Sequence, residues 1–491
     1  MPRRIRAGLF SVLALSLLVG CAINPVTGQR ELVLMSPERE AQLGRQAASQ
    51  VAEEMGLVES PALTAYVDEL GQRLARHSPR RDVVYRFAVV DMEEPNAFAL
   101  PGGYIYVSRG LLAIADSEAE LANVIGHEIG HVAARHSAQR ETRALGVGVL
   151  AAIGTIAAGA VGGEGAAQGA SQIAQVAGAG LIASYGRDQE RQADEVGQEL
   201  AAQAGWDPAA MASFLRTLGR DAELRSGEPR RPSFLDSHPM TDERVQNTAV
   251  RADSLRVAPA APISGTRSGF YARLENLLIG PNPAEGLFRE ERFLHPDMDF
   301  ALDFPRGWET QNGRTAVAAQ SPRGDAVLVL QAQGETGDPV EAAQTFAREN
   351  ELELSGGERD RIGGFSSYRA LDEVQTQQGT AVMELTWIAH PRAMFRLLGL
   401  YPSDRVSEYA RDLREAALSF RRLDQRERDG ITELRLRVAT ARAGESLASL
   451  SRRTKNAWSL EETAVANDLS LEQRLRKGEP VKIAVEVPYR R

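Results

Sequence analysis

The pentapeptide His127-Glu128-Ile129-Gly130-His131 constrains the fold of this chain more than any other feature. In a helix, a separation of four residues places both histidines on one face, one turn apart, where they can bind one metal ion. The preceding residues predict such a helix, because Ser117 can cap it and Glu120 can reach back to the capping residue. Apolar residues follow at helical spacing: Leu121, Ile125, Ile129 and Val132. We therefore expect a buried, metal-binding helix from Ser117 to about Gln139.

Glu128 is predicted to act as a base rather than as a ligand. It lies about 100° round the helix from His127, from where a carboxylate can reach a water on the metal. A catalytic zinc also needs a third protein ligand. Position 137, six residues after His131, would complete a longer histidine signature, but it is Ser137. A continuing helix would turn His136 away from the metal, so we interpret it as a core histidine or a neighbour of a ligand.

A second predicted helix, from about Arg187 to Gln203, offers carboxylates for the third position. Glu190 and Asp194 lie one turn apart on one face of it. Glu190 as the ligand, with Asp194 accepting the free N–H of a ligand histidine, would match the usual arrangement of zinc sites. Spacing alone leaves Glu195 and Glu199 as rival ligands. A strip of small residues would let this helix approach the first one closely: Ala193, Gly197 and Ala201.

Several motifs together resemble the zinc peptidases of the HtpX and CAAX-prenyl-protease type. They are the pentapeptide followed by Arg135-His136, the segment Glu190-Arg191-Gln192-Ala193-Asp194, the stretch from Asn96 to Val107, and His238-Pro239 with Arg244. The resemblance covers roughly residues 21–265. It implies a mainly helical, gluzincin-type metallopeptidase domain with a small sheet, at 21–270, and it implies Glu190 as the third ligand.

The same resemblance implies a mechanism with one zinc per chain. His127, His131 and Glu190 would hold the zinc, which lowers the pKa of a bound water toward about 7, and Glu128 would take its proton. His238 resembles a family histidine that approaches the site, either to stabilise the oxyanion or to block the open position. The residue Asp194 would fix a ligand histidine from behind.

The implied substrates are unfolded or misassembled envelope proteins. The stretch from Asn96 to Val107 resembles an edge strand on which an extended polypeptide adds as a further strand. Asn24-Pro25-Val26-Thr27-Gly28 resembles the periplasmic lipoprotein branch, that of the BepA-like proteases, although the tetratricopeptide repeats of that branch are not found here. A zinc-stabilised holdase that does not cut and a cell-wall tether are the alternatives.

The N-terminus predicts export. Arg3, Arg4 and Arg6 precede an uncharged apolar run that ends at Gly20, as in a secretory leader spanning 1–20. Leu18-Val19-Gly20-Cys21 resembles the bacterial lipobox, which implies a lipid on Cys21 and, with Ala22 next, a periplasmic position on the outer membrane. The formal net charge of -9 argues against a nucleic-acid partner, whose phosphates would require a basic face. We expect residues 22–35 to be a tether.

The remaining predicted elements of the first domain are few. We expect helices at 36–55 and 61–76 and strands at 83–90 and 104–107. The Gly/Ala-rich segment 144–183 contains a stretch, 144–163, that is uncharged for long enough to suggest a membrane span. A single span would leave His131 and Glu190 on opposite sides, so we predict a helical hairpin or flap near the cleft.

Two further domains are expected after residue 280. Residues 285–422 alternate as strands with two helices, near 339–350 and 405–419, and "FPRGW" with this strand order resembles a PsbP-like α+β sandwich. The expected strands lie at 300–304, 315–320, 326–331, 368–374, 381–388 and 394–400. Asp424 to Asp429 is predicted to be a charged linker. Residues 432–487 resemble a small βααβ module of the LysM type, which elsewhere binds peptidoglycan glycan. The predicted fold class is therefore multidomain α+β.

Overall fold

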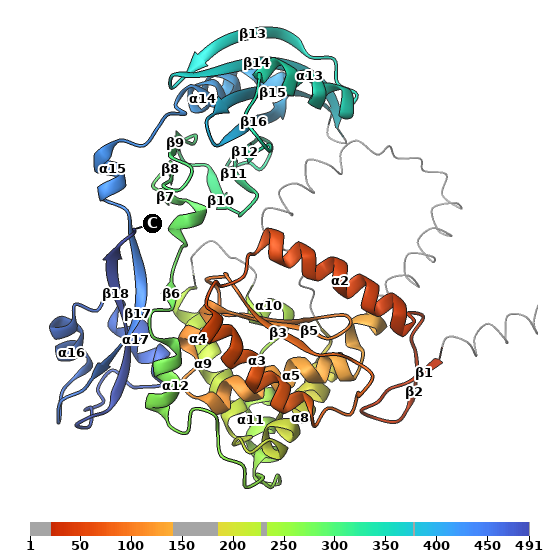
Figure 1. Ribbon diagram of the computed structural model, residues 1–491, viewed down its shortest axis with the longest axis vertical. Helices are drawn as coiled ribbons and strands as arrows, with labels where there is room; N and C mark the ends of the chain where they lie inside the picture. Colours follow the sequence, from red (N-terminus) through yellow and green to blue (C-terminus); the bar gives the residue numbers. More distant parts are fainter. Residues whose placement is uncertain (1–20, 141–184, 227–232, 377–378, 491) are drawn as a thin grey trace, which may run out of the picture.

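The computed structural model describes residues 21–140, 185–226, 233–376 and 379–490. These residues form a mixed α+β structure, with a helical N-terminal region and a sheet-rich region after it (Figure 1). The expected leader, 1–20, and the expected Gly/Ala-rich hairpin, 144–183, lie outside the described residues. Within the described ranges, no helix is both long and apolar enough to cross a bilayer.

A three-stranded sheet lies at the centre of the N-terminal region. Its strands, in spatial order, are β3 (Arg86–Val90), β5 (Tyr104–Ser108) and β4 (Ala97–Leu100). β3 runs parallel to β5, and β4 runs antiparallel to it. The stretch from Asn96 to Val107 is therefore a hairpin, and the expectation of one continuous strand is wrong. Gly102 and Gly103 permit the reversal, because their φ values of 76° and 94° lie in the region that favours glycine.

Helices cover both faces of this sheet. They are α2 (Pro37–Glu54) on one face, and α3 (Pro61–Ala75) and α5 (Glu118–Ala133) on the other. Val51 of α2 packs in a cluster with Phe98, whereas the neighbouring Ala97 joins the core that contains α3 and α5. Successive strand residues point to opposite faces, so one short strand contributes to two cores. The helices predicted at 36–55 and 61–76 are confirmed.

The metal-site helix α5 begins as predicted but ends early. The Ser117 hydroxyl accepts a hydrogen bond from the Glu120 amide at 3.2 Å. The Glu120 carboxylate accepts from the Asp116 amide rather than from that of Ser117. The helix stops at Ala133, and Arg135 adopts a left-handed φ of 59°. The predicted extension to about Gln139 as one helix is therefore wrong, because the backbone turns at Arg135.

Helix α8 (Arg187–Gln203) matches its predicted bounds and packs closely against α5. The close approach depends on glycines of both helices. A Cβ atom at Gly197 would lie 2.6 Å from the His127 amide nitrogen, and one at Gly126 would lie 2.8 Å from the Gly197 carbonyl oxygen. Gly130 likewise faces Ala193. Small residues at this crossing therefore let the two helices bring their side chains into one site.

Further helices belong to this region. They are α4 (Arg109–Ile114), α9 (Ala210–Leu224), α10 (Phe234–Ser237), α11 (Asp242–Ala252) and α12 (Arg267–Leu274).

The segment expected as a tether is instead docked on the N-terminal region. β1 (Cys21–Ile23) and β2 (Arg30–Leu32) form a hairpin. Asn24 is buried and donates to Glu31 at 2.9 Å. Glu31 in turn accepts from Gln139, whose side-chain oxygen accepts from Gln189 at the start of α8. The expectation of a free tether over residues 22–35 is thus wrong, because hydrogen bonds connect the hairpin to α8.

A seven-stranded antiparallel sheet forms the second region, with spatial order β10-β11-β12-β16-β15-β14-β13. The strands are β10 (Glu309–Asn312), β11 (Ala316–Gln320), β12 (Val327–Ala332), β13 (Ser355–Ile362), β14 (Phe365–Thr376), β15 (Gly379–His390) and β16 (Ala393–Pro402). Trp387 of β15 packs in the cluster of helix α13 (Pro339–Glu349), and Ile388 packs in that of α14 (Val406–Leu418). Successive side chains of β15 therefore point to opposite faces of the sheet, where one packs against α13 and the next against α14.

A smaller sheet of β7 (Leu287–Arg289), β8 (Arg292–His295) and β9 (Phe300–Asp303) adjoins this region. Residues 424–429, expected as a linker, contain the short helix α15 (Gln425–Asp429), because Asp424 and Glu427 form a capping box. The expected linker therefore contains one turn of helix.

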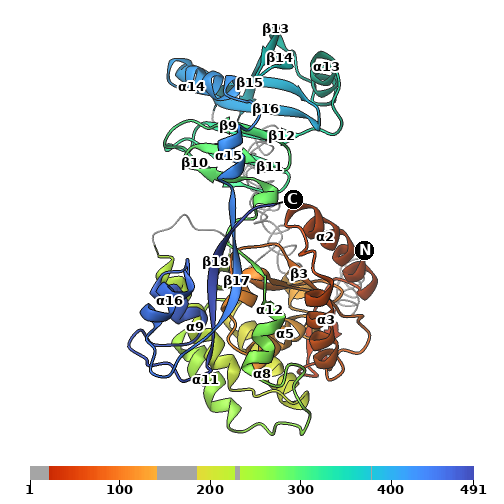
Figure 2. The same ribbon diagram turned by 60° about the vertical axis from the view of Figure 1, so that its left-hand side comes forward.

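The C-terminal segment returns to the N-terminal region. It runs as β17 (Thr432–Thr440), α16 (Leu447–Thr454), α17 (Leu460–Ala466) and β18 (Pro480–Pro488). β17 pairs with β18 on one side and with β6 (Leu278–Ile279) on the other. In Figures 1 and 2, β17 and β18 stand beside the helical region, and the seven-stranded sheet lies beyond one end of it. The chain thus leaves through β6 and returns beside it through β17.

A buried lysine marks this return. Lys482 of β18 is fully buried, and its ammonium group donates to the carbonyl oxygens of Ala113, at 2.9 Å, and Ala115, at 2.5 Å. Leu436 of β17 belongs to the same core as α3 and α5. The C-terminal segment therefore contributes to the packing of the N-terminal region.

Candidate metal centre

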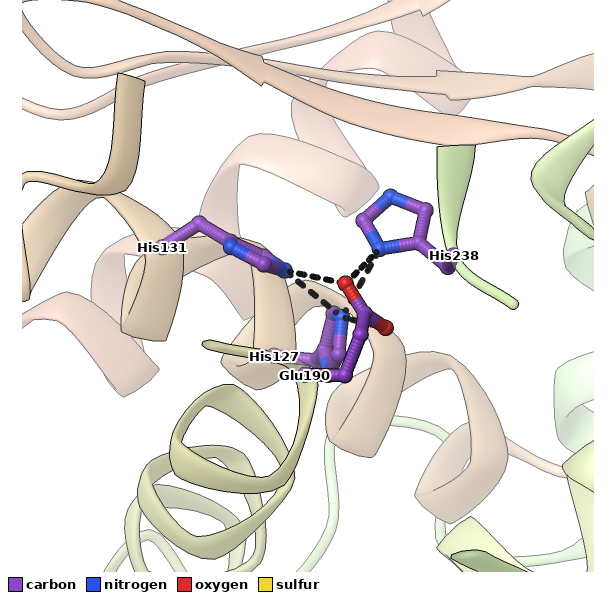
Figure 3. A group of neighbouring side chains, drawn as sticks. All are labelled: His127, His131, Glu190 and His238. Carbon is purple, nitrogen blue, oxygen red and sulfur yellow. Dashed lines mark hydrogen bonds and ion pairs between the residues drawn. The ribbon is translucent and has the colours of Figure 1, made fainter. Parts of the chain in front are cut away.

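Four buried side chains converge between α5 and α8. His127 and His131 come from α5, Glu190 from the first turn of α8, and His238 from the residue that ends α10. One potential ligand atom of each lies within 4.8 Å of the others. Figure 3 shows the three imidazoles and the carboxylate pointing toward one common point.

The donor atoms are close to one another. The Nε2 atoms of His127 and His131 are 3.0 Å apart. Glu190 Oε1 lies 3.4 Å from His131 Nε2, and Glu190 Oε2 lies 3.6 Å from His127 Nε2. Helical spacing brings the two histidines together as predicted, and the glycine-lined crossing brings Glu190 to them. The structure therefore assembles the three residues that were expected to bind the metal.

His238 occupies the remaining side of the group. Its Nδ1 lies 3.1 Å from His127 Nε2 and 3.0 Å from Glu190 Oε1 (Figure 3). The ring stacks on Phe234 at 4.2 Å, and the Phe234 amide donates to the carbonyl of Pro95, just before β4. His238 is thus held as a fourth donor, in the position that a catalytic metal would leave for water.

Glu128 is completely buried beside this group. Neither of its carboxylate oxygens has a hydrogen-bond partner, and Oε1 lies 3.5 Å from His238 Nε2. Burial raises the pKa of Glu128, against the lowering effect of the nearby His238 and His127. A buried carboxylate whose oxygens accept no hydrogen bond from the described residues suits a group that exchanges protons.

Asp194 and Arg244 support two of the donors. Asp194 Oδ1 accepts from His127 Nδ1 at 2.8 Å, so the neutral His127 presents its Nε2 lone pair to the group. Arg244 contacts Asp194 Oδ1 at 2.7 Å and Glu190 Oε2 at 2.8 Å. Burial opposes ionisation of Asp194, but the bonds from His127 and Arg244 outweigh it and lower its pKa. Burial also opposes ionisation of Glu190. The charge of His238 and the hydrogen bonds with His131 and His238 outweigh it, so the pKa of Glu190 is lowered as well.

The rival ligands lie elsewhere. Glu195 and Glu199 are exposed on α8, and the Glu199 carboxylate lies 3.8 Å from Arg251. Cys21 pairs through its backbone with Leu32 in the N-terminal hairpin.

Sequence reasoning missed one contact of His131. Tyr185 stacks on its ring at 3.9 Å, with its hydroxyl 3.2 Å from that of Ser137. The interpretation of His136 as a core histidine or a neighbour of a ligand is confirmed, because it is buried and its Nδ1 lies 2.8 Å from the other nitrogen of His131. The only sequence feature that could have indicated a role for Tyr185 is its position two residues before α8.

The donor set fits a tetrahedral metal such as zinc. Zinc binds imidazole nitrogen and carboxylate oxygen, and three such ligands with a fourth position are typical of its catalytic sites. In this structure, four buried side chains each offer one ligand atom, and these atoms lie within 4.8 Å of one another. Imidazole nitrogens that converge with a carboxylate oxygen in this way are best explained by a metal ion between them.

Comparisons with known proteins agree with this geometry. Residues 61–252 match the model of peptidase family M48. The chain is 32% identical over 247 residues to the beta-barrel assembly-enhancing protease of Yersinia pestis, which covers 48% of this chain and 49% of the relative. It is 33% identical over 228 residues to the protein of that name from Escherichia coli K12, which covers 45% of each. The chain spans about half the length of the curated relatives it matches.

A solved structure aligns with part of the chain. The cyanobacterial PsbP protein of Synechocystis aligns with a TM-score of 0.24 at 14% identity, covering 28% of this chain and 95% of that protein.

Proposed function

We propose that this chain is a zinc-dependent endopeptidase whose centre is His127, His131 and Glu190. The observation that carries the proposal is the buried four-donor group with an unpartnered Glu128 beside it. The match of residues 61–252 to peptidase family M48 supports the same chemistry. Zinc, when bound, would acidify a water and polarise the scissile carbonyl.

Glu128 would act as the general base and then as the general acid. Its carboxylate takes a proton from the attacking water and returns it to the leaving amine. Its burial and raised pKa favour holding a proton between these steps. Asp194 keeps the Nε2 lone pair of His127 directed at the metal, and Arg244 holds Asp194 and Glu190 in place.

His238 would block the site in the resting chain. Of its two expected roles, the distances favour obstruction, because its Nδ1 stands among the ligands rather than outside them. Opening the site then requires His238 to move away. The short helix α10, which His238 ends, is bound to Pro95, two residues before β4, so substrate and α10 would compete for the same edge.

The substrates would be unfolded or misassembled envelope polypeptides. An extended chain could add to the outer edge of β4, which within the described residues pairs only with β5. Such binding recognises backbone, so the specificity would be broad. The relatives' printed name, beta-barrel assembly-enhancing protease, supports a role in outer-membrane protein assembly.

We further propose the chain's location and organisation. Cys21 would carry a lipid that holds the protein on the periplasmic face of the outer membrane. The domains would be a peptidase at 21–270, a PsbP-like sandwich at 285–422 and a LysM-like module at 432–487. The strand-helix-helix-strand order of the last module supports the third assignment, and peptidoglycan would be its partner.

The decisive experiment is cleavage of casein or unfolded porin by purified residues 22–491. The assay compares protein with zinc, protein with chelator, and the Glu128→Gln variant. Cutting that requires both zinc and Glu128 supports the endopeptidase. One bound zinc per chain without cutting, also after His238→Ala, would favour a non-cleaving holdase instead.

A further inference from the structure

We propose that His136 is a positioning residue for His131, and that it links the two helices that supply the metal ligands. The inference deepens the proposed function and rests on it only in requiring that the site bind zinc. The observation behind it is a continuous hydrogen-bond path from His131 through His136 to Gln192.

The direction of the first hydrogen bond follows from the metal site. The Nε2 of His131 faces Glu190 and His127, so its lone pair belongs to the metal. A neutral imidazole then carries its hydrogen on Nδ1. That atom lies 2.8 Å from His136 Nδ1. His131 therefore donates and His136 accepts.

The second hydrogen bond follows from the first. With a lone pair on Nδ1, neutral His136 carries its hydrogen on Nε2. Nε2 lies 2.8 Å from the side-chain oxygen of Gln192, which is an acceptor. Gln192 stands on α8, two residues after the ligand Glu190. Each hydrogen thus has an acceptor, and the path joins α5 to α8 beside the metal.

The backbone turn at Arg135 brings His136 to this place. Its left-handed φ of 59° redirects the chain after α5, so His136 contacts His131 rather than continuing the helix. Side-chain bonds stabilise the turn: Arg135 donates to Glu40 at 3.1 Å and to the Met35 carbonyl at 2.7 Å. Glu40 is also paired with the buried Arg80 at 2.7 Å. The turn is therefore fixed by a buried ion-pair network.

His136 and Asp194 perform matching tasks on the two ligand histidines. Asp194 orients His127 with a carboxylate, whereas His136 orients His131 with a neutral imidazole. Partners of this kind fix the tautomer and the ring orientation of a ligand, and their loss commonly lowers metal affinity by about 10–100-fold.

Two variants separate positioning from packing. His136→Phe keeps an aromatic ring but removes the acceptor. His136→Asn places an amide oxygen near the position of Nδ1, so it can still accept from His131. The matched control is His390→Phe, which changes another buried histidine, in the core of the seven-stranded sheet and remote from the site. Zinc affinity of the full chain is measured by competition with a chromophoric chelator, and the absorption of bound Co²⁺ reports the ligand geometry.

We expect His136→Phe to weaken zinc binding by about 10–100-fold and to change the Co²⁺ spectrum. His136→Asn should recover most of the affinity, and His390→Phe should leave it unchanged. Wild-type affinity and spectrum in a folded His136→Phe protein would overturn the inference. So would equal losses in the Phe and Asn variants. A chain that binds zinc but cuts nothing, also after His238→Ala, would contradict the endopeptidase alone, because the affinity comparison does not depend on cleavage.

Discussion

Asp194 Oδ1 lies 2.8 Å from His127 Nδ1, and the same oxygen lies 2.7 Å from Arg244. The carboxylate therefore fixes the ligand tautomer while its own charge is neutralised from behind. Asp194→Ala should lower zinc affinity by about 10–100-fold, because His127 loses its acceptor and Arg244 is left partly unpaired. Chelator competition measures the loss. Asp188→Ala, an exposed position on the same helix, is the control and should bind zinc normally.

His238→Ala should increase peptidase activity. If the blocked form is favoured by about 1.4 kcal/mol, removing the imidazole raises the active fraction about tenfold. Three ligands remain, so the zinc content should stay near one per chain. The measurement is the initial rate of casein cleavage at equal zinc content. A fall in the rate with zinc retained would assign His238 to oxyanion stabilisation instead.

Gly197→Ala should disrupt the site without touching a ligand. The new Cβ would lie 2.6 Å from the His127 amide nitrogen, so α8 must move away from α5 and take Glu190 with it. We expect a loss of about 1–3 kcal/mol in stability together with weaker zinc binding. Gly186→Ala is the matched control, because its Cβ would meet nothing nearer than 3.8 Å. Chemical unfolding and zinc titration of both variants test this, and two indistinguishable variants would refute it.

Lys482→Met should destabilise the N-terminal region, although the residue belongs to the C-terminal segment. The change leaves the carbonyls of Ala113 and Ala115 without their donor and removes the positive charge that faces Glu120 and Asp116. Breaking a buried charge arrangement costs about 3–5 kcal/mol. The exposed Lys477→Met serves as the control. Protease sensitivity near α5 measures the effect, and unaltered protection in Lys482→Met would contradict the prediction.

Glu120 should make stability depend on pH. Burial raises its pKa from 4.5 to about 7, against the lowering effect of the hydrogen bond from the Asp116 amide. The charge of Asp116 raises the pKa further, and Lys482 lowers it. The folded state then holds this proton more tightly than the unfolded chain, so stability falls as the pH rises from 4.5 through 7, by up to about 3 kcal/mol. Burial lowers the pKa of Lys482 only to about 8, so the lysine remains protonated over most of this window. Glu120→Gln should flatten the profile of unfolding free energy between pH 5 and 7, and parallel profiles would exclude this assignment.

The elements with strong local signals were predictable. Helix α8 follows from its spacing and from the glycine at 205, and the strands β14, β15 and β16 follow from their apolar and β-branched residues. β13 was not predictable, because its residues are charged and almost all exposed, so no hydrophobic period marks it. Its pairing with β14 alone defines it as a strand.

The site was predictable in its residues more than in its surroundings. Helical spacing brings His127 and His131 together whatever the rest of the chain does. The position of His136 depends on the left-handed backbone of Arg135. Because this residue is not a glycine, the sequence gives no signal for the turn. The place of His238 depends on the contact of α10 with Pro95, and that of Lys482 on a strand made more than 300 residues after α5. Tertiary contacts of this kind leave no local pattern.

The return of β17 beside β6 also sets an order of events during synthesis. Residues 280–431 must emerge between two strands that pair with each other. Until β17 and β18 have followed, Leu436 and Lys482 are missing from the core around α5. Domains usually fold as units while the chain is being made, but this one receives its last core contacts only after Lys482 has been synthesised. A nascent chain that still lacks these core residues would be prevented from cutting neighbouring proteins until its synthesis has passed residue 482.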